Sequence, residues 1–121
     1  MDVIQGADFA IRTTLADASN NAIDLTTGVA RFMLKAKVAD PDIKALVTFD
    51  STGSPGLFDF SEAAAGAVVT RVAGNLTAAL DIKDKLKVFA QVEVKVTSGQ
   101  DSFFYRSPTV EFNLVESVIG S

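Results

Sequence analysis

The amino-acid sequence predicts an all-β protein, an antiparallel β-sandwich of about seven strands. Apolar side chains recur at every second position in residues 9–15, 30–38 and 86–97. Because successive side chains of a strand point to opposite sides, each segment offers one apolar face to a core. Clusters of Gly, Pro, Asn, Asp and Ser separate these segments at short intervals, as is typical of turns between strands.

Three strands are expected in the first half of the chain. The first covers residues 8–16 and ends at the polar turn of residues 17–21; the second covers residues 28–38. We expect these two strands to form one half of the sandwich. Their inward positions are Phe9, Ile11, Thr13, Leu15, Ala30, Phe32, Leu34, Ala36 and Val38. Pro41 then interrupts the chain, and a third strand at residues 44–50 ends at the loop of residues 51–56.

The second half of the chain contains the longest predicted strand. Before it, we expect a short strand at residues 57–60, a helical turn at 62–65, a strand at 67–72, and either strand or short helix at 75–80. The long strand covers residues 86–97 and leads through the hairpin turn 98–101 into a return strand that bends at Pro108. Its inward positions, and those of the return strand, are Val88, Ala90, Val92, Val94, Val96, Val110, Phe112 and Leu114.

Length and charge limit the classes of function. A chain of 121 residues is expected to form one domain, residues 1–121. The net charge of −4 argues against nucleic acid or an anionic membrane as the main partner. Residues 1–7 carry no basic residue and no apolar run, so we expect no signal peptide and synthesis in the cytosol.

The sequence contains neither histidine nor cysteine, which removes the commonest general base and the usual transition-metal ligands. The carboxylates left as catalytic candidates are Asp59, Glu62, Asp81 and Asp84, and their spacing does not force any two together. The oxygen-rich segments 17–21 and 40–42 suit calcium, but they match no EF-hand and are better explained as turns. We therefore expect no enzyme activity, no cofactor and no metal.

Five aromatic residues are candidates for an interface: Phe58, Phe60, Phe103, Phe104 and Tyr105. Three adjacent aromatic residues on one strand cannot all face a single core. Two interpretations of residues 103–105 stay open: the outward ring covers a loop or turn of its own chain, or it lies in a subunit interface, where aromatic residues are enriched. Phe58 and Phe60 allow the same two interpretations, and loop aromatic residues can also stack on sugar rings.

A resemblance to a known family begins near Gly6. The order Gly6-x-Asp8-Phe9, an alternating strand, a polar turn, residues 23–26, Gly28 and the strand that follows resembles the immunoglobulin-like domain of phage tail-associated and baseplate proteins of the upper-baseplate-protein type. In that family an Asp-Leu-Thr-Gly run introduces the second strand; here Thr27 is inserted before Gly28. The resemblance covers about the first third of the chain and implies an immunoglobulin-like sandwich.

The resemblance also implies a function. It suggests a non-enzymatic phage virion protein, of the tail, baseplate or head, that assembles with copies of itself and with other virion structural proteins. The family has no catalytic residue to carry over, and Asp24 and Gly28 would serve the turn before the second strand. The alternative is a small module that binds a carbohydrate or a host surface.

Overall fold

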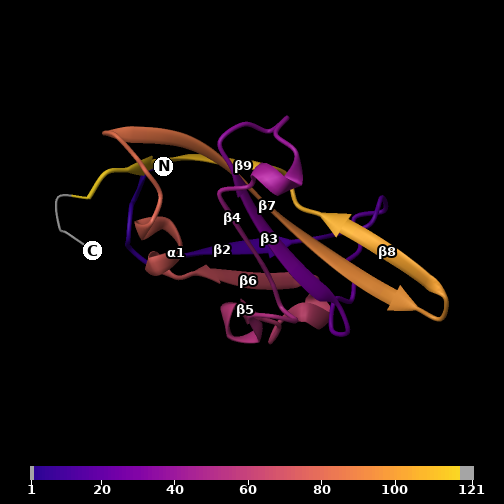
Figure 1. Cartoon of the computed structure of the whole chain (residues 1–121). Helices are drawn as coiled ribbons and strands as arrows, with labels where there is room; N and C mark the ends of the chain where they lie inside the picture. Colours follow the sequence, from indigo (N-terminus) through magenta and orange to yellow (C-terminus); the bar gives the residue numbers. More distant parts are fainter. Residues whose placement is uncertain (1, 118–121) are drawn as a thin grey trace.

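The structure of this protein is a computed structural model, in which residues 2–117 are described. They form two β-sheets that share one apolar core (Figure 1). The larger sheet has the order β1 (Asp2–Ile4), β9 (Val110–Val115), β7 (Lys85–Ser98), β3 (Val29–Lys35), β4 (Val47–Asp50), and β8 (Asp101–Arg106) pairs with β7 beyond the start of β9. The smaller sheet has the order β2 (Phe9–Thr14), β6 (Ala67–Val72), β5 (Phe58–Asp59). The predicted all-β sandwich is confirmed.

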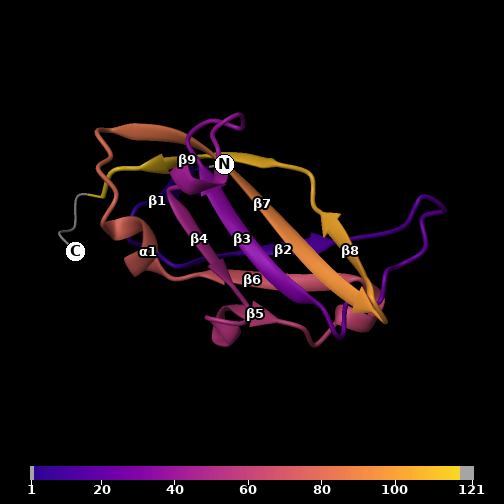
Figure 2. The same cartoon turned by 45° about the vertical axis from the view of Figure 1, so that its right-hand side comes forward.

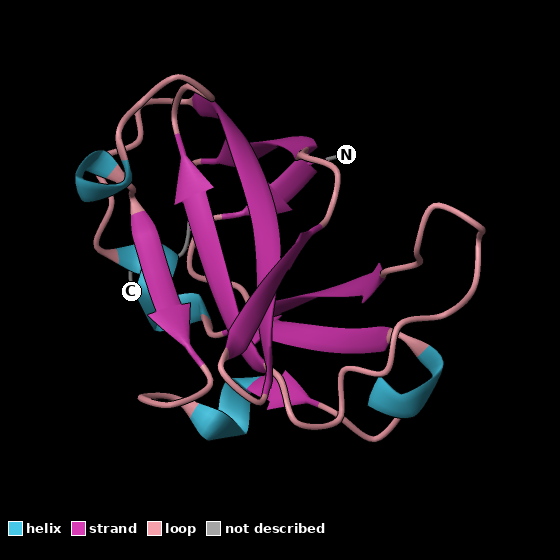
Figure 3. Ribbon diagram, turned by 90° about the vertical axis from the view of Figure 1, so that its right-hand side faces the viewer, coloured by secondary structure: helices cyan, strands magenta, loops and turns pink. Residues whose placement is uncertain are grey.

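Helical structure in residues 2–117 consists of short segments, which lie around the margins of the sheets (Figure 3). The α-helix α1 covers Gly74–Ala78, and 3₁₀ turns cover Asp42–Lys44, Pro55–Leu57 and Ala63–Ala65. The helical turn expected at residues 62–65 is therefore confirmed. Of the two alternatives for residues 75–80, the helix is the one observed.

The strand order is that of the immunoglobulin fold, in which strands B, E and D of one sheet face strands C, F and G of the other. Here β2, β6 and β5 occupy the places of B, E and D, and β3, β7 and β9 occupy those of C, F and G. The strand β4 extends the larger sheet beside β3. The strand β1 pairs in parallel with β9, whereas every other strand pair of the described residues is antiparallel.

Two details of the predicted sandwich are wrong. The described residues form nine strands rather than about seven, because β1 is too short to show alternation and the return strand splits around Pro108. Between β8 and β9, Ser107 still pairs with Val92: its N–H donates to the carbonyl of Val92, and its Oγ accepts the N–H of Val92. The strands β2 and β3 do not form one half, since they lie in different sheets. Their connection carries the chain from one sheet to the other.

The predicted inward faces are confirmed over most of their length. In the larger sheet, nine inward residues are at most 2% exposed: Ala30, Phe32, Leu34, Val88, Ala90, Val92, Val94, Phe112 and Leu114. From the smaller sheet, Val68 and Val72 are buried, and Phe9 and Ile11 pack against the same core. The prediction for Val38 is wrong: this residue is 61% exposed, because β3 ends at Lys35 and the chain leaves the sheet. Lys44 likewise belongs to a 3₁₀ turn, so β4 begins only at Val47.

The connections between strands gather at two ends of the sandwich (Figure 2). The pairing of Val29 with Lys95 and of Arg31 with Asp50 places the β2–β3 connection, the β4–β5 connection and the β7–β8 hairpin at one end. The segment before β2, the helix α1 and the end of β9 lie at the other. Met1 and residues 118–121 of the predicted domain lie outside the described residues.

Candidate functional site

The end of β7 and the strand β8 form a hairpin that extends past the ends of β2 and β6 (Figure 1). The register runs from Ser98 opposite Asp101 to Glu93 opposite Arg106. Gly99 in the turn has a φ of 63°, a left-handed conformation that glycine adopts without strain. The hairpin predicted at residues 98–101 is therefore confirmed.

The three adjacent aromatic residues of β8 lie on both faces of this hairpin. Phe103 and Tyr105 are opposite Val96 and Val94, so they share the inward side of the larger sheet. Tyr105 is half-buried against the core, whereas Phe103 is 46% exposed. Phe104 lies on the outer face and is 56% exposed, with the Nζ of Lys95 5.8 Å from its ring centroid. Two of the three rings are thus available to a partner.

Phe58 and Phe60 lie elsewhere. Phe58 is buried, and its ring is 5.4 Å from that of Phe49, which in turn stacks 5.1 Å from Phe32. Phe60 is half-buried, with its ring 6.4 Å from Phe58. Phe58 is therefore not an interface candidate: its ring joins the two sheets inside the core.

A groove of about 370 Å³ lies on the outer face of the larger sheet, between β3, the segment after β3, β7, and the end of β8 with the segment that follows it. Met33, Phe89 and Val38 give it apolar walls. Charged and polar side chains line the rest: Arg31, Lys35, Asp42, Gln91, Glu93, Arg106 and Thr109. Methionine, arginine and aromatic residues are the types enriched in protein interfaces. The groove thus has a composition suited to a protein partner.

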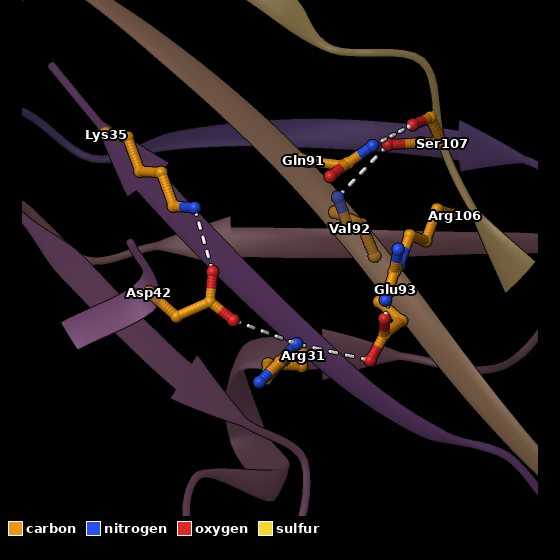
Figure 4. A network of polar contacts seen from close by, with 8 residues as sticks. All are labelled: Arg31, Lys35, Asp42, Gln91, Val92, Glu93, Arg106 and Ser107. Carbon is orange, nitrogen blue, oxygen red and sulfur yellow. Dashed lines mark hydrogen bonds and ion pairs between the residues drawn. The ribbon is translucent and has the colours of Figure 1, made fainter. Parts of the chain in front are cut away.

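An ion-pair network crosses this groove (Figure 4). The Nζ of Lys35 lies 2.8 Å from Asp42, and Arg31 lies 3.8 Å from Asp42 and 3.4 Å from Glu93. The Nε of Arg106 donates to Glu93 at 2.6 Å. Three cationic groups therefore share two carboxylates, which leaves the network with an excess positive charge.

The network shifts two pKa values. The hydrogen bond from Lys35, together with the charge of Lys35, holds the pKa of Asp42 below its usual value. The hydrogen bond to Glu93, and then the charge of Glu93, raises the pKa of Arg106. Both effects keep the network charged at neutral pH. Arg31, Glu93 and Arg106 carry no signal in the sequence that singles them out, because they are outward positions of three strands whose pairing the sequence does not state.

Asp24 and Gly28 shape the entry into β3. One carboxylate oxygen of Asp24 accepts the backbone N–H of Thr26 at 2.9 Å and also the hydroxyl of Thr26. These bonds lower the pKa of Asp24. The N–H of Gly28 donates to the carbonyl of Leu25, and a Cβ at Gly28 would lie 2.5 Å from Val94. Both residues are therefore engaged in the local turn and packing.

The Gly6-x-Asp8 motif is engaged in a second structural contact. Asp8 accepts the N–H of Gly74 at the start of α1, at 2.6 Å, and the N–H of Gly6 donates to the buried hydroxyl of Thr77 at 3.0 Å. The side-chain amide of Gln5 donates to carbonyls at the end of the same helix. A Cβ at Gly74 would overlap the carbonyl of Gly6, so glycine is required there. The hydrogen bonds of the motif thus hold the segment before β2 against α1.

The carboxylates considered for catalysis lie apart or are occupied. Asp59 accepts the N–H of Ser61, which lowers its pKa, and Glu62 pairs with Arg12. Asp59 pairs with Val69 of β6 and Glu62 lies in the turn before that strand, whereas Asp81 and Asp84 lie after α1, in the segment that leads into β7. In the turn of residues 17–21, Asp17 accepts the N–H groups of Ser19 and Asn21. Within residues 2–117, no three acidic side chains gather where they could hold a metal ion.

Comparison with family models, with curated proteins and with solved structures gives no match to this chain. A membrane-spanning helix is not found in the part of the chain that the structure describes. The site residues therefore have to be interpreted from their own geometry.

Proposed function

We propose that this protein is a non-enzymatic structural component of a phage virion, which acts through contacts with copies of itself and with other virion proteins. Three features support this proposal. The motifs around Gly6 and Asp24 resemble those of the phage immunoglobulin-like domain. The chain has neither histidine nor cysteine for common catalytic chemistry. Its surface presents aromatic rings that its own core does not use.

The exposure of Phe103 and Phe104 carries the proposal. Folding gains little from an aromatic ring that is half exposed, since the free energy of burial scales with the apolar area removed from water. Two such rings on adjacent positions of a projecting hairpin are better explained by a partner that covers them. Their arrangement on opposite faces means that a partner at the hairpin edge contacts both.

The groove on the outer face extends the same surface. Arg106 of β8 lines the groove, and Phe104 lies two residues away on the same face. An excess of positive charge in the groove favours a partner with acidic groups at its rim. The rest of the chain carries the opposite balance, because the whole chain has a net charge of −4.

Mass spectrometry of purified phage particles from the parent host tests the proposal directly. We expect the wild-type chain in the particles, and we expect Phe104→Ser to lower its incorporation because one exposed anchor is lost. The matched control is Ile4→Ser, which removes an exposed apolar side chain at the opposite end of the sandwich. A folded wild-type chain that is absent from particles and binds glycans on an array would contradict the proposal and support the carbohydrate-binding alternative.

A further inference from the structure

We propose that β8 pairs antiparallel with β8 of a second copy around a two-fold axis, which joins the two larger sheets into one continuous sheet. This inference rests on the proposed function, in that it names self-association as one of the contacts. It starts from the edge of the larger sheet. Among the described strands, β8 hydrogen-bonds to β7 alone, whereas β9, on the same side of β7, is covered by β1.

The free edge of β8 carries backbone groups at known positions. In an antiparallel pair, residues alternate between those that exchange hydrogen bonds with the neighbour and those whose N–H and C=O point away. The N–H of Ser107 donates to Val92, so position 107 belongs to the bonded set. Because the two sets alternate, Tyr105, Phe103 and Asp101 also bond to β7. Ser102, Phe104 and Arg106 belong to the other set. Their N–H and C=O groups therefore point to the open edge.

The side chains of β8 do not block this edge. Natural sheets protect exposed edge strands with charged side chains, especially lysine, with proline, with bulges or with a covering segment. The six residues of β8 include no lysine and no proline; the two charged residues, Asp101 and Arg106, stand at its ends, and its middle contains the adjacent aromatic residues 103–105. An edge of this kind is suited to pairing with another strand.

The pattern of side chains along β8 favours a second copy of the same strand as the partner at this edge. A two-fold axis perpendicular to the sheet preserves its faces, so each residue lies opposite one whose side chain points to the same face. Centring the pair on Phe104 places Phe104 opposite Phe104 of the second copy and Phe103 opposite Tyr105. Aromatic cross-strand pairs stabilise antiparallel strands, and this register forms three of them. Centring on Phe103 instead places Phe104 opposite Ser102, which loses two of these pairs.

Charge also selects the antiparallel arrangement. Asp101 begins β8 and Arg106 ends it. An antiparallel partner brings the Asp101 end of one strand to the Arg106 end of the other, whereas a parallel partner would place like charges together. A second copy therefore complements the strand in hydrogen bonds, aromatic pairs and charge.

Single-cysteine variants test this register, because the natural chain contains no cysteine. In the proposed dimer, the two Cα atoms at position 104 lie about 5.5 Å apart, within the range of a disulfide. The two Cα atoms at position 102 are displaced by four residues, about 13 Å. We expect Phe104→Cys to form a disulfide-linked dimer under mild oxidation at least about ten times faster than Ser102→Cys. In denaturant the two rates should become equal, which controls for thiol reactivity.

Sedimentation of the wild-type chain gives a readout that does not depend on cysteine. We expect a monomer–dimer equilibrium, weakened at least about tenfold by Phe104→Pro, which removes an outward N–H that β7 does not use. Phe104→Tyr, which keeps both ring and N–H, should stay dimeric. Equal cross-linking of positions 102 and 104, or a wild-type chain that stays monomeric, overturns the β8 dimer. A monomeric chain that is nevertheless found in particles leaves the proposed virion function intact.

Discussion

Phe112 of β9 and Phe103 of β8 lie on the same side of β7 and point to the same face of the larger sheet, opposite Val88 and Val96. Phe112 is 2% exposed and packs edge-on against Phe9 of the smaller sheet at 5.5 Å. Phe103 is 46% exposed. The two residues have the same side chain, the same neighbouring strand and the same face of the sheet, and they differ in whether the second sheet covers them. The position in the pleat sets the direction of a side chain, whereas the opposite sheet sets its burial.

The largest loss of stability is expected from substitution of Phe112. Replacing it by alanine leaves a cavity between β9 and β2, and Phe→Ala changes in cores cost about 3–5 kcal/mol. Denaturant unfolding followed by circular dichroism measures this loss. A loss below about 1 kcal/mol would mean that the two sheets are not closed over this position.

Gly28 marks the point where the chain crosses from the smaller sheet to the larger. Its alanine variant forces a Cβ to within 2.5 Å of Val94, the last fully buried residue of β7. Overpacking of this kind costs about 1–3 kcal/mol. The same thermal or denaturant measurement on Gly56→Ala is the control, since a Cβ there meets no atom within 4 Å. Equal stability of the two variants would contradict the packing at Gly28.

The part of the molecule where the two sheets face each other also contains a buried hydroxyl group. Thr70 of β6 is fully buried, and its Oγ1 has no hydrogen-bond partner among the described residues. We expect Thr70→Val to raise the free energy of unfolding by about 1 kcal/mol, because it removes an unsatisfied polar group. Thr77→Val is the matched control. It should lower the free energy of unfolding by about 1–3 kcal/mol, since the N–H of Gly6 loses its hydrogen-bond acceptor. Destabilisation by both changes would indicate a partner for Thr70.

Substitutions in the β7–β8 hairpin, which the smaller sheet does not cover, are expected to change the stability of the isolated monomer only weakly. Phe103→Ala removes a ring that the smaller sheet does not cover, so it should change the free energy of unfolding by less than about 1 kcal/mol. The comparison with Phe112→Ala should be made at a protein concentration where sedimentation shows monomer. A loss as large as that of Phe112→Ala would mean that the hairpin ring is part of the core after all.

The smallest change in stability is expected from the ion-pair network that crosses the groove. The pKa of Asp42 is lowered in the folded chain, so its contribution to stability is present above its unfolded pKa of about 4 and is lost as the pH falls through the folded value. Stability should therefore fall between about pH 5 and pH 3 slightly less in Asp42→Asn than in the wild type. Unfolding curves across this pH range provide the measurement. An identical pH dependence would show that the exposed pair contributes nothing.

The sequence predicted strand existence better than strand pairing. Residues 67–72 match β6 at both ends, and the inward residues of β7 follow the expected alternation. The sequence did not reveal β1, because three residues show no period, nor the placing of β2 and β3 in different sheets. The groove was equally hidden, because Arg31, Glu93 and Arg106 meet only through strand pairing. Of the aromatic interface candidates, Phe58 lies in the core, and Phe60 and Tyr105 are half-buried against it.

By itself, the sequence determined that this chain forms strands, where its turns fall, and which side of each strand is apolar. These are local properties, set by the two-residue period of a strand and by the backbone preferences of glycine, proline and short polar residues. The tertiary structure decided which strands are neighbours and which apolar residues stay uncovered. Those outcomes depend on contacts between residues distant in the chain, and so the exposure of Phe103 and Phe104 became visible only when both sheets were in place.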